Sequence, residues 1–215
     1  MLFRSPGIRA TQALDAWMDR TYREILRHGK PDDNHLSSLI AMYIYGRSFF
    51  LADRPVANEH KQAVDYWLGQ AKKYWLQVAN RQSQAHLAVG LKRFGDKETP
   101  AGIMASIKER SVSNEEMGMF WRDLELQQFW FRAPIETQAM MIEAFDEVSN
   151  DQKAVEECKV WLIKQKTAYE MFNRDWSSDV CSSDLGFFVA EALEADGEVS
   201  LALAVGHLQD RKSVV

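Results

Sequence analysis

Residues 11–28 read TQALDAWMDRTYREILRH, and their pattern decides the fold class of the chain. Large and mostly apolar side chains recur there at spacings of three and four, the repeat of one face of an α-helix. They are Leu14, Trp17, Met18, Thr21, Tyr22 and Ile25. Thr11 is the predicted N-cap, and Gly29 with Pro31 just beyond it predicts the end of the helix. The stretch therefore predicts one amphipathic helix.

The same repeat continues along most of the chain. Further helices are predicted at about 34–50, 56–75, 82–94, 99–110 and 134–148, and a last one begins at 150–151. Gly95 with Asp96 predicts the end of the helix at 82–94, and Thr99 is the predicted N-cap of the next helix, which carries Pro100 at its first position. Because the intervening turns are short, neighbouring helices are expected to form antiparallel hairpins. The fold class expected from the sequence is all-α.

Besides the first helix, four of these helices carry a predicted apolar stripe. That of 56–75 is Val64, Trp67, Leu68, Ala71 and Trp75. The stripe of 34–50 is Leu36, Leu39, Ile40, Tyr43 and Ile44, that of 134–148 is Ile135, Ala139, Ile142, Phe145 and Val148, and that of the last helix is Ala154, Val155, Cys158, Trp161 and Leu162. Met140, Met141 and Ala144 lie off the stripe of 134–148, which predicts that this helix is buried on most sides. Residues 112–132 lose the helical repeat and are rich in aromatic residues, so they are expected to form a long loop or a short hairpin.

The composition excludes several classes of protein. The chain has 215 residues, 46% of them hydrophobic and 27% charged, with a formal net charge of -5. These values are typical of a soluble globular protein. A net negative charge argues against a general nucleic-acid binder, which needs a basic face. No apolar run approaches the length of a membrane span, and residues 1–9 lack the apolar core of a signal peptide.

No known catalytic or cofactor motif occurs in the sequence. There is no Gly-rich phosphate loop, no H-E-x-x-H and no G-x-S-x-G. The two cysteines, Cys158 and Cys181, have no metal-ligand spacing, and Cys158 is predicted to be a buried, inert thiol. The scattered histidines His28, His35, His60, His86 and His207 are predicted to be core or surface residues. No catalytic, cofactor-binding or metal residue is therefore assigned.

The acidic residues permit one catalytic hypothesis. Glu136 and Glu143 are seven residues apart, which places them on one helix face. Others lie in or beside the aromatic segment: Glu115, Glu116, Asp123 and Glu125. An acid/base pair beside a sugar-stacking platform would indicate a carbohydrate-active enzyme. The favoured alternative is that these carboxylates are solvated or cap helices, and that the aromatic residues fill the core.

Three segments do not resemble natural protein sequence. They are residues 1–5 (MLFRS), 175–185 (DWSSDVCSSDL) and 210–215 (DRKSVV). Each contains a translation of one oligonucleotide, GCTCTTCCGATCT or its complement, which resembles a short-read sequencing adapter. We therefore expect a chimera in which 6–174 is the genuine insert and 186–209 is an unrelated fragment between two adapter-like segments. The alternative, an ordinary Ser/Asp-rich loop, would leave the chain as one continuous protein.

Several blocks in the 11–166 region resemble the helical domain of bacterial alpha-2-macroglobulin family proteins. The first four are 33–38 (DNHLSS), 47–50 (RSFF), 70–76 (QAKKYWL) and 93–100 (RFGDKETP). The more specific ones are 113–121 (SNEEMGMFW), 134–148 (PIETQAMMIEAFDEV) and 151–166. Their order and spacing, rather than any single block, carry the resemblance.

The resemblance implies a fold, a function and a location. It implies part of an α/α toroid, the thioester domain, truncated at both ends of 6–174. The parent would be a protease-trapping inhibitor in the periplasm or anchored to a membrane, with proteases and its own other domains as partners. The Cys-x-Glu-Gln thioester motif of some members is absent here, so this chain is expected to be non-catalytic and without cofactor. A carbohydrate-active enzyme fragment and a helical interaction scaffold are the alternatives.

Overall fold

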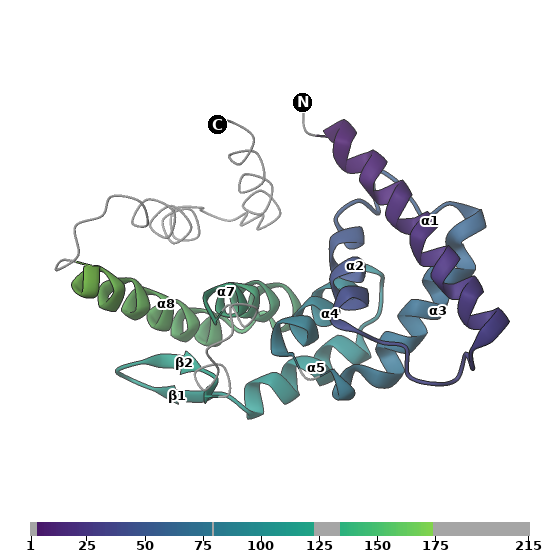
Figure 1. Cartoon of the computed structure of the whole chain (residues 1–215). Coiled ribbons are helices and arrows are strands. Elements are labelled where there is room, and N and C mark those ends of the chain that lie inside the picture. Colours follow the sequence, from purple (N-terminus) through teal and green to yellow (C-terminus); the bar gives the residue numbers. More distant parts are fainter. Residues whose placement is uncertain (1–3, 79, 123–133, 174–215) are drawn as a thin grey trace. The chain divides into compact units, whose positions relative to one another are not determined.

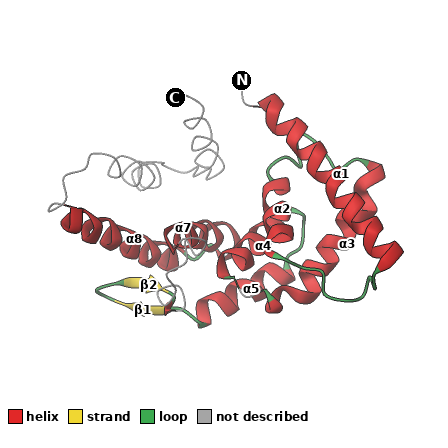
Figure 2. Ribbon diagram, in the orientation of Figure 1, coloured by secondary structure: helices red, strands yellow, loops and turns green. Residues whose placement is uncertain are grey.

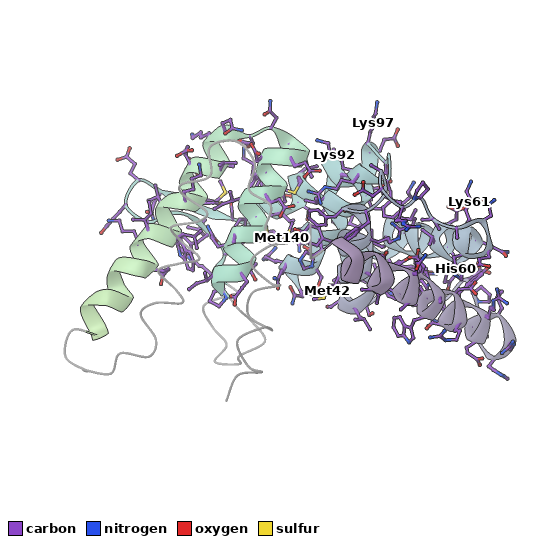
Figure 3. All side chains as sticks on the ribbon, turned by 90° about the horizontal axis from the view of Figure 1, so that it is seen from above. Met42, His60, Lys61, Lys92, Lys97 and Met140 are labelled. Atoms are coloured by element: carbon purple, nitrogen blue, oxygen red, sulfur yellow. The ribbon has the colours of Figure 1, made fainter. Side chains whose placement is uncertain are left out.

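The computed structural model describes residues 4–78, 80–122 and 134–173, and the side chains of 10–78, 80–122 and 134–165. Of the described residues, 74% are helical, so the predicted all-α class is confirmed (Figure 2). The chain divides into two compact units. Among the described residues, unit 1 comprises 4–78, 80–109 and 147–149, and unit 2 comprises 110–122, 134–146 and 150–173.

Unit 1 is built from helices. They are α1 (Arg4–His28), α2 (Ser38–Ser48), α3 (Asn58–Tyr74) with the 3₁₀ turn η1 (Trp75–Gln77), α4 (Arg81–Arg93) and α5 (Glu98–Glu109). α1 packs against α3, α2 packs against α4, and α4 packs against α5 (Figure 1). The fully buried side chains of this unit include Met18, Ile44, Trp67, Leu87, Leu91, Ile103 and Ile107.

Side-chain caps fix where several helices of unit 1 begin. Ser37 and Asn80 accept hydrogen bonds from backbone N–H groups in the first turns of α2 and α4. Two predicted caps are wrong. Thr11 lies inside α1, which begins at Arg4, and α5 is capped by Asp96, whose Oδ1 accepts from the backbone N–H of Glu98 at 3.0 Å. The sequence pattern placed these starts too late because a helix can begin before its apolar repeat.

Gly95 ends α4 in the way that the sequence predicts. Its φ of +96° lies in the left-handed region that favours glycine. Its N–H donates to the carbonyl oxygen of Lys92, and the N–H of Asp96 donates to that of Leu91, each at 2.9 Å. This pair of bonds is the Schellman motif, so the predicted stop at the end of α4 is confirmed.

Two of the predicted apolar stripes in unit 1 face the core only in part. On α1, Met18 and Tyr22 are buried as predicted, but Leu14 and Trp17 are 45% and 37% exposed. On α2, Ile40, Tyr43 and Ile44 are buried as predicted, but Leu39 is 55% exposed. α1 buries polar residues in place of Leu14 and Trp17, for the reason given under the candidate site.

Unit 2 combines a hairpin with two helices. Its elements are β1 (Val112–Asn114), β2 (Gly118–Phe120), α7 (Pro134–Ala144), the π-helical turn η2 (Phe145–Ser149), which extends into residues assigned to unit 1, and α8 (Gln152–Asn173). β1 and β2 pair antiparallel with Val112 opposite Phe120. Of the two structures predicted for this region, the short hairpin is therefore found over 112–120. α8 packs against β2 and α7 (Figure 1).

Gly118 lets the hairpin approach α8 closely. Its φ is +70°, and a Cβ atom built there would overlap the backbone carbonyl oxygen of Glu157 and meet the Cβ of Val160 at 3.0 Å. A glycine is therefore required here for two independent reasons, backbone conformation and space. The N-terminus of α8 is fixed by Asp151, whose Oδ1 accepts from the N–H of Ala154 at 3.1 Å.

The two helices of unit 2 differ in how well the sequence predicts their buried faces. On α8, all five predicted core residues, Ala154, Val155, Cys158, Trp161 and Leu162, are buried. On α7 the predicted stripe is wrong, because the buried residues are Thr137, Gln138, Met140, Met141 and Ala144. The companion prediction, that apolar residues off the stripe are buried too, holds for Met140, Met141 and Ala144. Of the predicted stripe, only Phe145 is buried, in η2. The reason is that this helix carries apolar side chains around most of its circumference, so periodicity alone cannot choose a face.

The predictions for residues 1–3, 123–133 and 174–215 lie outside the described residues. They include the adapter-like segments 175–185 and 210–215, the fragment 186–209, and the carboxylates Asp123 and Glu125. Within the described part of the chain, no helix is both long enough and apolar enough to cross a membrane.

Candidate functional site

The main polar site of unit 1 lies on the buried face of α1. Thr11, Asp15 and Asp19 recur every four residues and are all buried. Residues four apart share one helix face, so α1 presents a polar stripe to its neighbours. Burying such groups is costly unless each is paired. The partners come from α2 and α3, far away in the sequence.

Asp15 and Arg47 form the centre of this site. The Nε of Arg47 donates to both carboxylate oxygens of Asp15, at 3.0 and 3.1 Å, and the hydroxyl of Tyr43 donates to Oδ1 at 2.7 Å. The Nη2 of Arg47 donates to the carbonyl oxygen of Arg54 at 2.7 Å. The side chains of the ion pair are 2% and 6% exposed. Burial, the hydrogen bond and the charge of Asp15 together raise the pKa of Tyr43 well above its ordinary value, so its hydroxyl stays protonated as the donor.

This network holds the helices together and offers no free reactive group at its centre. Removing one partner of a buried ion pair leaves an uncompensated charge, which costs about 3–5 kcal/mol. The remaining Arg47 nitrogen, Nη1, is buried and has no hydrogen-bond partner among the described residues. The arrangement therefore fixes α1 on α2 and is incompatible with any other rotation of α1 about its axis.

A second set of charges lies one turn further along α1. The Oδ2 of Asp19 is 2.9 Å from Arg23 Nη2 and 3.8 Å from the Nδ1 of His60 on α3. The Nε2 of His60 is 3.4 Å from Glu59 Oε1. A histidine between two carboxylates is chemically able to exchange protons. The Nδ1 of His60 has no hydrogen-bond partner among the described residues. The 3.8 Å separation is too long for the hydrogen bond that an acid–base dyad would need.

A polar clasp joins the loop after α1 to α3. We use this name for residues 30–37 and the α3 side chains that bind their backbone. The Nε2 of Gln70 donates to the carbonyl oxygens of Pro31 and Asp33, at 3.2 and 3.1 Å, and its Oε1 accepts from the N–H of His35 at 2.9 Å. Tyr66 and Tyr74 add hydroxyl bonds to the carbonyl oxygens of Pro31 and Asp32. The loop backbone is thus held by one helix face, and Gln70 is satisfied on both ends of its amide.

The α2–α4 contact carries an aromatic cluster with one cation. The guanidinium of Arg93 lies 4.1 Å from the ring centroid of Phe49 and 5.7 Å from that of Tyr45. The same guanidinium binds both carboxylate oxygens of Glu147, at 2.9 and 2.5 Å. The imidazole of His86 stacks on Tyr45, with centroids 4.7 Å apart. The cation is therefore held between an aromatic face and a carboxylate.

The carboxylates of the catalytic hypothesis do not occupy a buried site. Glu115 and Glu116 lie exposed in the turn between β1 and β2, and Glu136 is exposed in the first turn of α7. Glu143 is half-buried on the same helix. The exposure of the first three fits the alternative given above, in which they are solvated. Asp123 and Glu125, which would complete the set, lie outside the described residues.

The cysteines and the remaining histidines were the other residues considered from the sequence. Burial raises the pKa of the Cys158 thiol to about 12, so the predicted buried thiol is found. His28 is exposed beside Glu24, and the Nε2 of His35 lies 2.9 Å from the carbonyl oxygen of Lys30. Cys181 and His207 lie outside the described residues. Within those residues, no group of three or more His, Cys, Asp or Glu side chains could hold a metal ion.

Sequence reasoning missed Asp15, Arg47 and Gln70, which make the buried polar contacts described above. One signal was present for Asp15, because Thr11, Asp15 and Asp19 repeat every four residues beside an apolar stripe. No comparable signal exists for Gln70, since its partners are backbone carbonyl and N–H groups. Those groups belong to every residue and leave no mark in a sequence.

No protein-family model, curated protein or solved structure matches this chain.

Proposed function

We propose that this chain is a non-catalytic part of the helical domain of a bacterial alpha-2-macroglobulin-like protein, whose parent traps proteases. One observation supports the proposal most directly. The sequence blocks that carry the resemblance are separated along the chain, and they contact one another in the folded units. Blocks whose residues contact one another are expected to occur together, because the loss of one block would leave residues of the other block without their partners.

The first contact joins block 33–38 to block 70–76 in the polar clasp. Gln70 binds the N–H of His35 and the carbonyl oxygen of Asp33. The second joins block 47–50 to block 93–100. Arg93 stacks on Phe49, and its Nη1 lies 3.4 Å from the Oγ of Ser48. Each pair is about 40 residues apart in the sequence.

The third contact joins three blocks within unit 2. The Nε2 of Gln138, in block 134–148, donates to the carbonyl oxygen of Met119 at 2.6 Å and to that of Cys158 at 3.3 Å. Trp121 and Phe145 stack with ring centroids 6.3 Å apart. Blocks 113–121, 134–148 and 151–166 therefore meet around one buried amide. The roles of these residues are structural, which favours a domain that acts through its shape over one that performs chemistry.

Exposed apolar side chains on unit 1 agree with a domain that is only partly present. Leu14 and Trp17 on α1, and Leu39 and Met42 on α2, are spaced by three residues within each helix and are all at least 37% exposed. A truncated helical toroid would leave such faces uncovered. On this proposal the parent lies outside the cytoplasm, as the resemblance implies.

The test begins with the source DNA. We would re-amplify and sequence it across codons 166–190 and upstream of codon 6. The proposal expects the adapter-like run to vanish and further helical sequence to follow residue 166. If 175–185 persists in the genomic DNA, the chimera is refuted and the chain is one continuous helical protein.

The function is then tested on the recovered parent. A trap that encloses a protease should block cleavage of a large protein substrate and leave cleavage of a small peptide substrate nearly unchanged. The control is the same protease with its active site irreversibly blocked. This protease should not be enclosed, because a trap of the resembled family closes only after the protease has cleaved an exposed bait region of the inhibitor. Equal inhibition of large and small substrates would indicate an ordinary active-site inhibitor, and no inhibition of either would reject the proposal.

A further inference from the structure

His86 is a titratable group that the proposed function does not use. It lies in the middle of α4 and is 8% exposed. Its ring stacks on Tyr45 of α2 with an interplanar angle of 25°. Its Nδ1 is buried and has no hydrogen-bond partner among the described residues. A proton placed on Nδ1 would therefore add a buried charge and a buried donor without an acceptor.

The surrounding contact is too close to admit solvent without movement. Gly90 lies one turn further along α4, where a Cβ would fall 2.8 Å from Ile44 Cγ2 and 3.1 Å from the backbone nitrogen of Tyr45. The backbones of α2 and α4 are thus in direct contact beside the imidazole. Water can therefore reach the buried Nδ1 of His86 only if the two helices separate.

The charged groups on the neighbouring elements do not compensate a proton on His86. On α2, the buried Arg47 is a cation already bound to Asp15. On α4, Arg93 is a second cation over the Tyr45 ring, and its carboxylate partner Glu147 is already engaged. α5 contributes the buried residues Pro100, Ile103, Met104 and Ile107, and η1 has no titratable side chain. The surroundings of the ring therefore favour its neutral form.

We propose that His86 is an acid-sensitive latch of unit 1, whose protonation releases α2 from α4. With a neutral imidazole, the α2–α4 contact is closed. With a protonated imidazole, the closed contact must bury an uncompensated cation, and the open state solvates it. The device needs no ligand, since solvent protons act on it directly.

The pH dependence of the α2–α4 contact follows from the pKa of His86 in its closed and open states. Burial lowers the pKa of His86 from 6.5 to about 4 in the closed state, while the open state keeps the ordinary value. Closure is therefore fully favoured above pH 6.5 and weakens as the pH falls toward 4. A difference of about 2.5 pH units corresponds to a rise of roughly 300-fold in the opening constant. About 20-fold of this should appear between about pH 7 and about pH 5, before most carboxylates are protonated.

The test uses the full chain and compares His86→Gln with His28→Gln. Hydrogen exchange of α2 and α4 amides, measured at about pH 7 and about pH 5 and corrected for intrinsic exchange, gives the opening constant at each pH. The unsubstituted chain and the control should open about 20-fold more readily at the lower pH. His86→Gln should lose most of this change. An equal pH dependence in all three proteins would overturn the proposal.

A second measurement keeps the proposal testable if His86→Gln does not fold. The chemical shift of the His86 ring proton can be followed by NMR in the unsubstituted chain as the pH is lowered. The latch requires a midpoint near 4, or a cooperative loss of the α2–α4 signals before it. A fast-exchange midpoint near 6.5 with the fold intact would show that the protonated ring is tolerated, and would reject the latch.

Discussion

Replacing Gly90 with alanine tests the closest helix contact in unit 1. At this position α4 lies against α2, and an added Cβ would be 2.8 Å from the Cγ2 of Ile44. The methyl end of Ile44 can turn away, but the backbone carbon of Ile44 and the backbone nitrogen of Tyr45, each 3.1 Å away, cannot. The substitution should therefore push α2 and α4 apart.

The magnitude can be worked out against a matched control. Alanine is favoured over glycine inside a helix by about 0.5–1 kcal/mol. Gly46, in the interior of α2, has nothing within 4 Å of an added Cβ, so Gly46→Ala should show this gain alone. Overpacking a core costs about 1–3 kcal/mol. Because the propensity gain is common to both variants, the difference between their free energies of unfolding isolates the steric cost, about 1–3 kcal/mol.

The measurement is urea unfolding followed by tryptophan fluorescence, with the buried Trp67 reporting on unit 1. We expect Gly90→Ala to unfold at lower urea than the unsubstituted chain, and Gly46→Ala at equal or higher urea. If the two variants are equally stable, α2 and α4 are not in backbone contact, and the reasoning on this interface is wrong.

Three further substitutions or measurements test other parts of the structure. Asp15→Asn should lower the free energy of unfolding by about 3–5 kcal/mol, because it leaves Arg47 charged and buried, and a urea titration showing less than about 1 kcal/mol would mean that the pair is solvated. Gly118→Ala should lower the free energy of unfolding of unit 2 by more than the ~1 kcal/mol typical of a glycine replacement, since the new methyl would overlap the Glu157 carbonyl group. Unchanged hydrogen exchange in α8 would contradict this. Cys158, with its pKa raised to about 12, should react with a thiol reagent at pH 8 only as fast as the chain unfolds, and rapid labelling without denaturant would contradict its burial.

The sequence predicts the helices well because periodicity and stop signals are local. Gly95 is an example, since a glycine after a helical repeat needs no knowledge of the rest of the fold. α8 is another, because five of its apolar residues share one face, and only Val160 and Ile163 among its large described apolar residues lie exposed. The caps at Thr11 and Thr99 were predicted wrongly, because several residues near a helix start can serve, and tertiary context selects among them.

The buried faces of α1 and α7 could be predicted only in part, for two different physical reasons. On α7 the apolar residues surround the helix, so burial of Met140 and Met141 is decided by what packs against them. On α1 the buried Asp15 is stabilised by Arg47, 32 residues further along the chain. A local pattern contains no information about that partner, and without it the apolar side with Leu14 and Trp17 is the reasonable choice. The polar site was missed for the same reason.

The buried polar face of α1 also limits which other helices could replace α1 and how α1 could be redesigned. An ordinary amphipathic helix can be replaced by many others that keep an apolar stripe, because apolar surfaces pack together without strong preference for a particular partner. α1 is more selective, because its buried Asp15 is stabilised only by a neighbour that offers the guanidinium of Arg47 and the hydroxyl of Tyr43. A graft of α1 into another helical scaffold should therefore succeed only when those two residues travel with it, and a library that varies α1 alone should return few folded members.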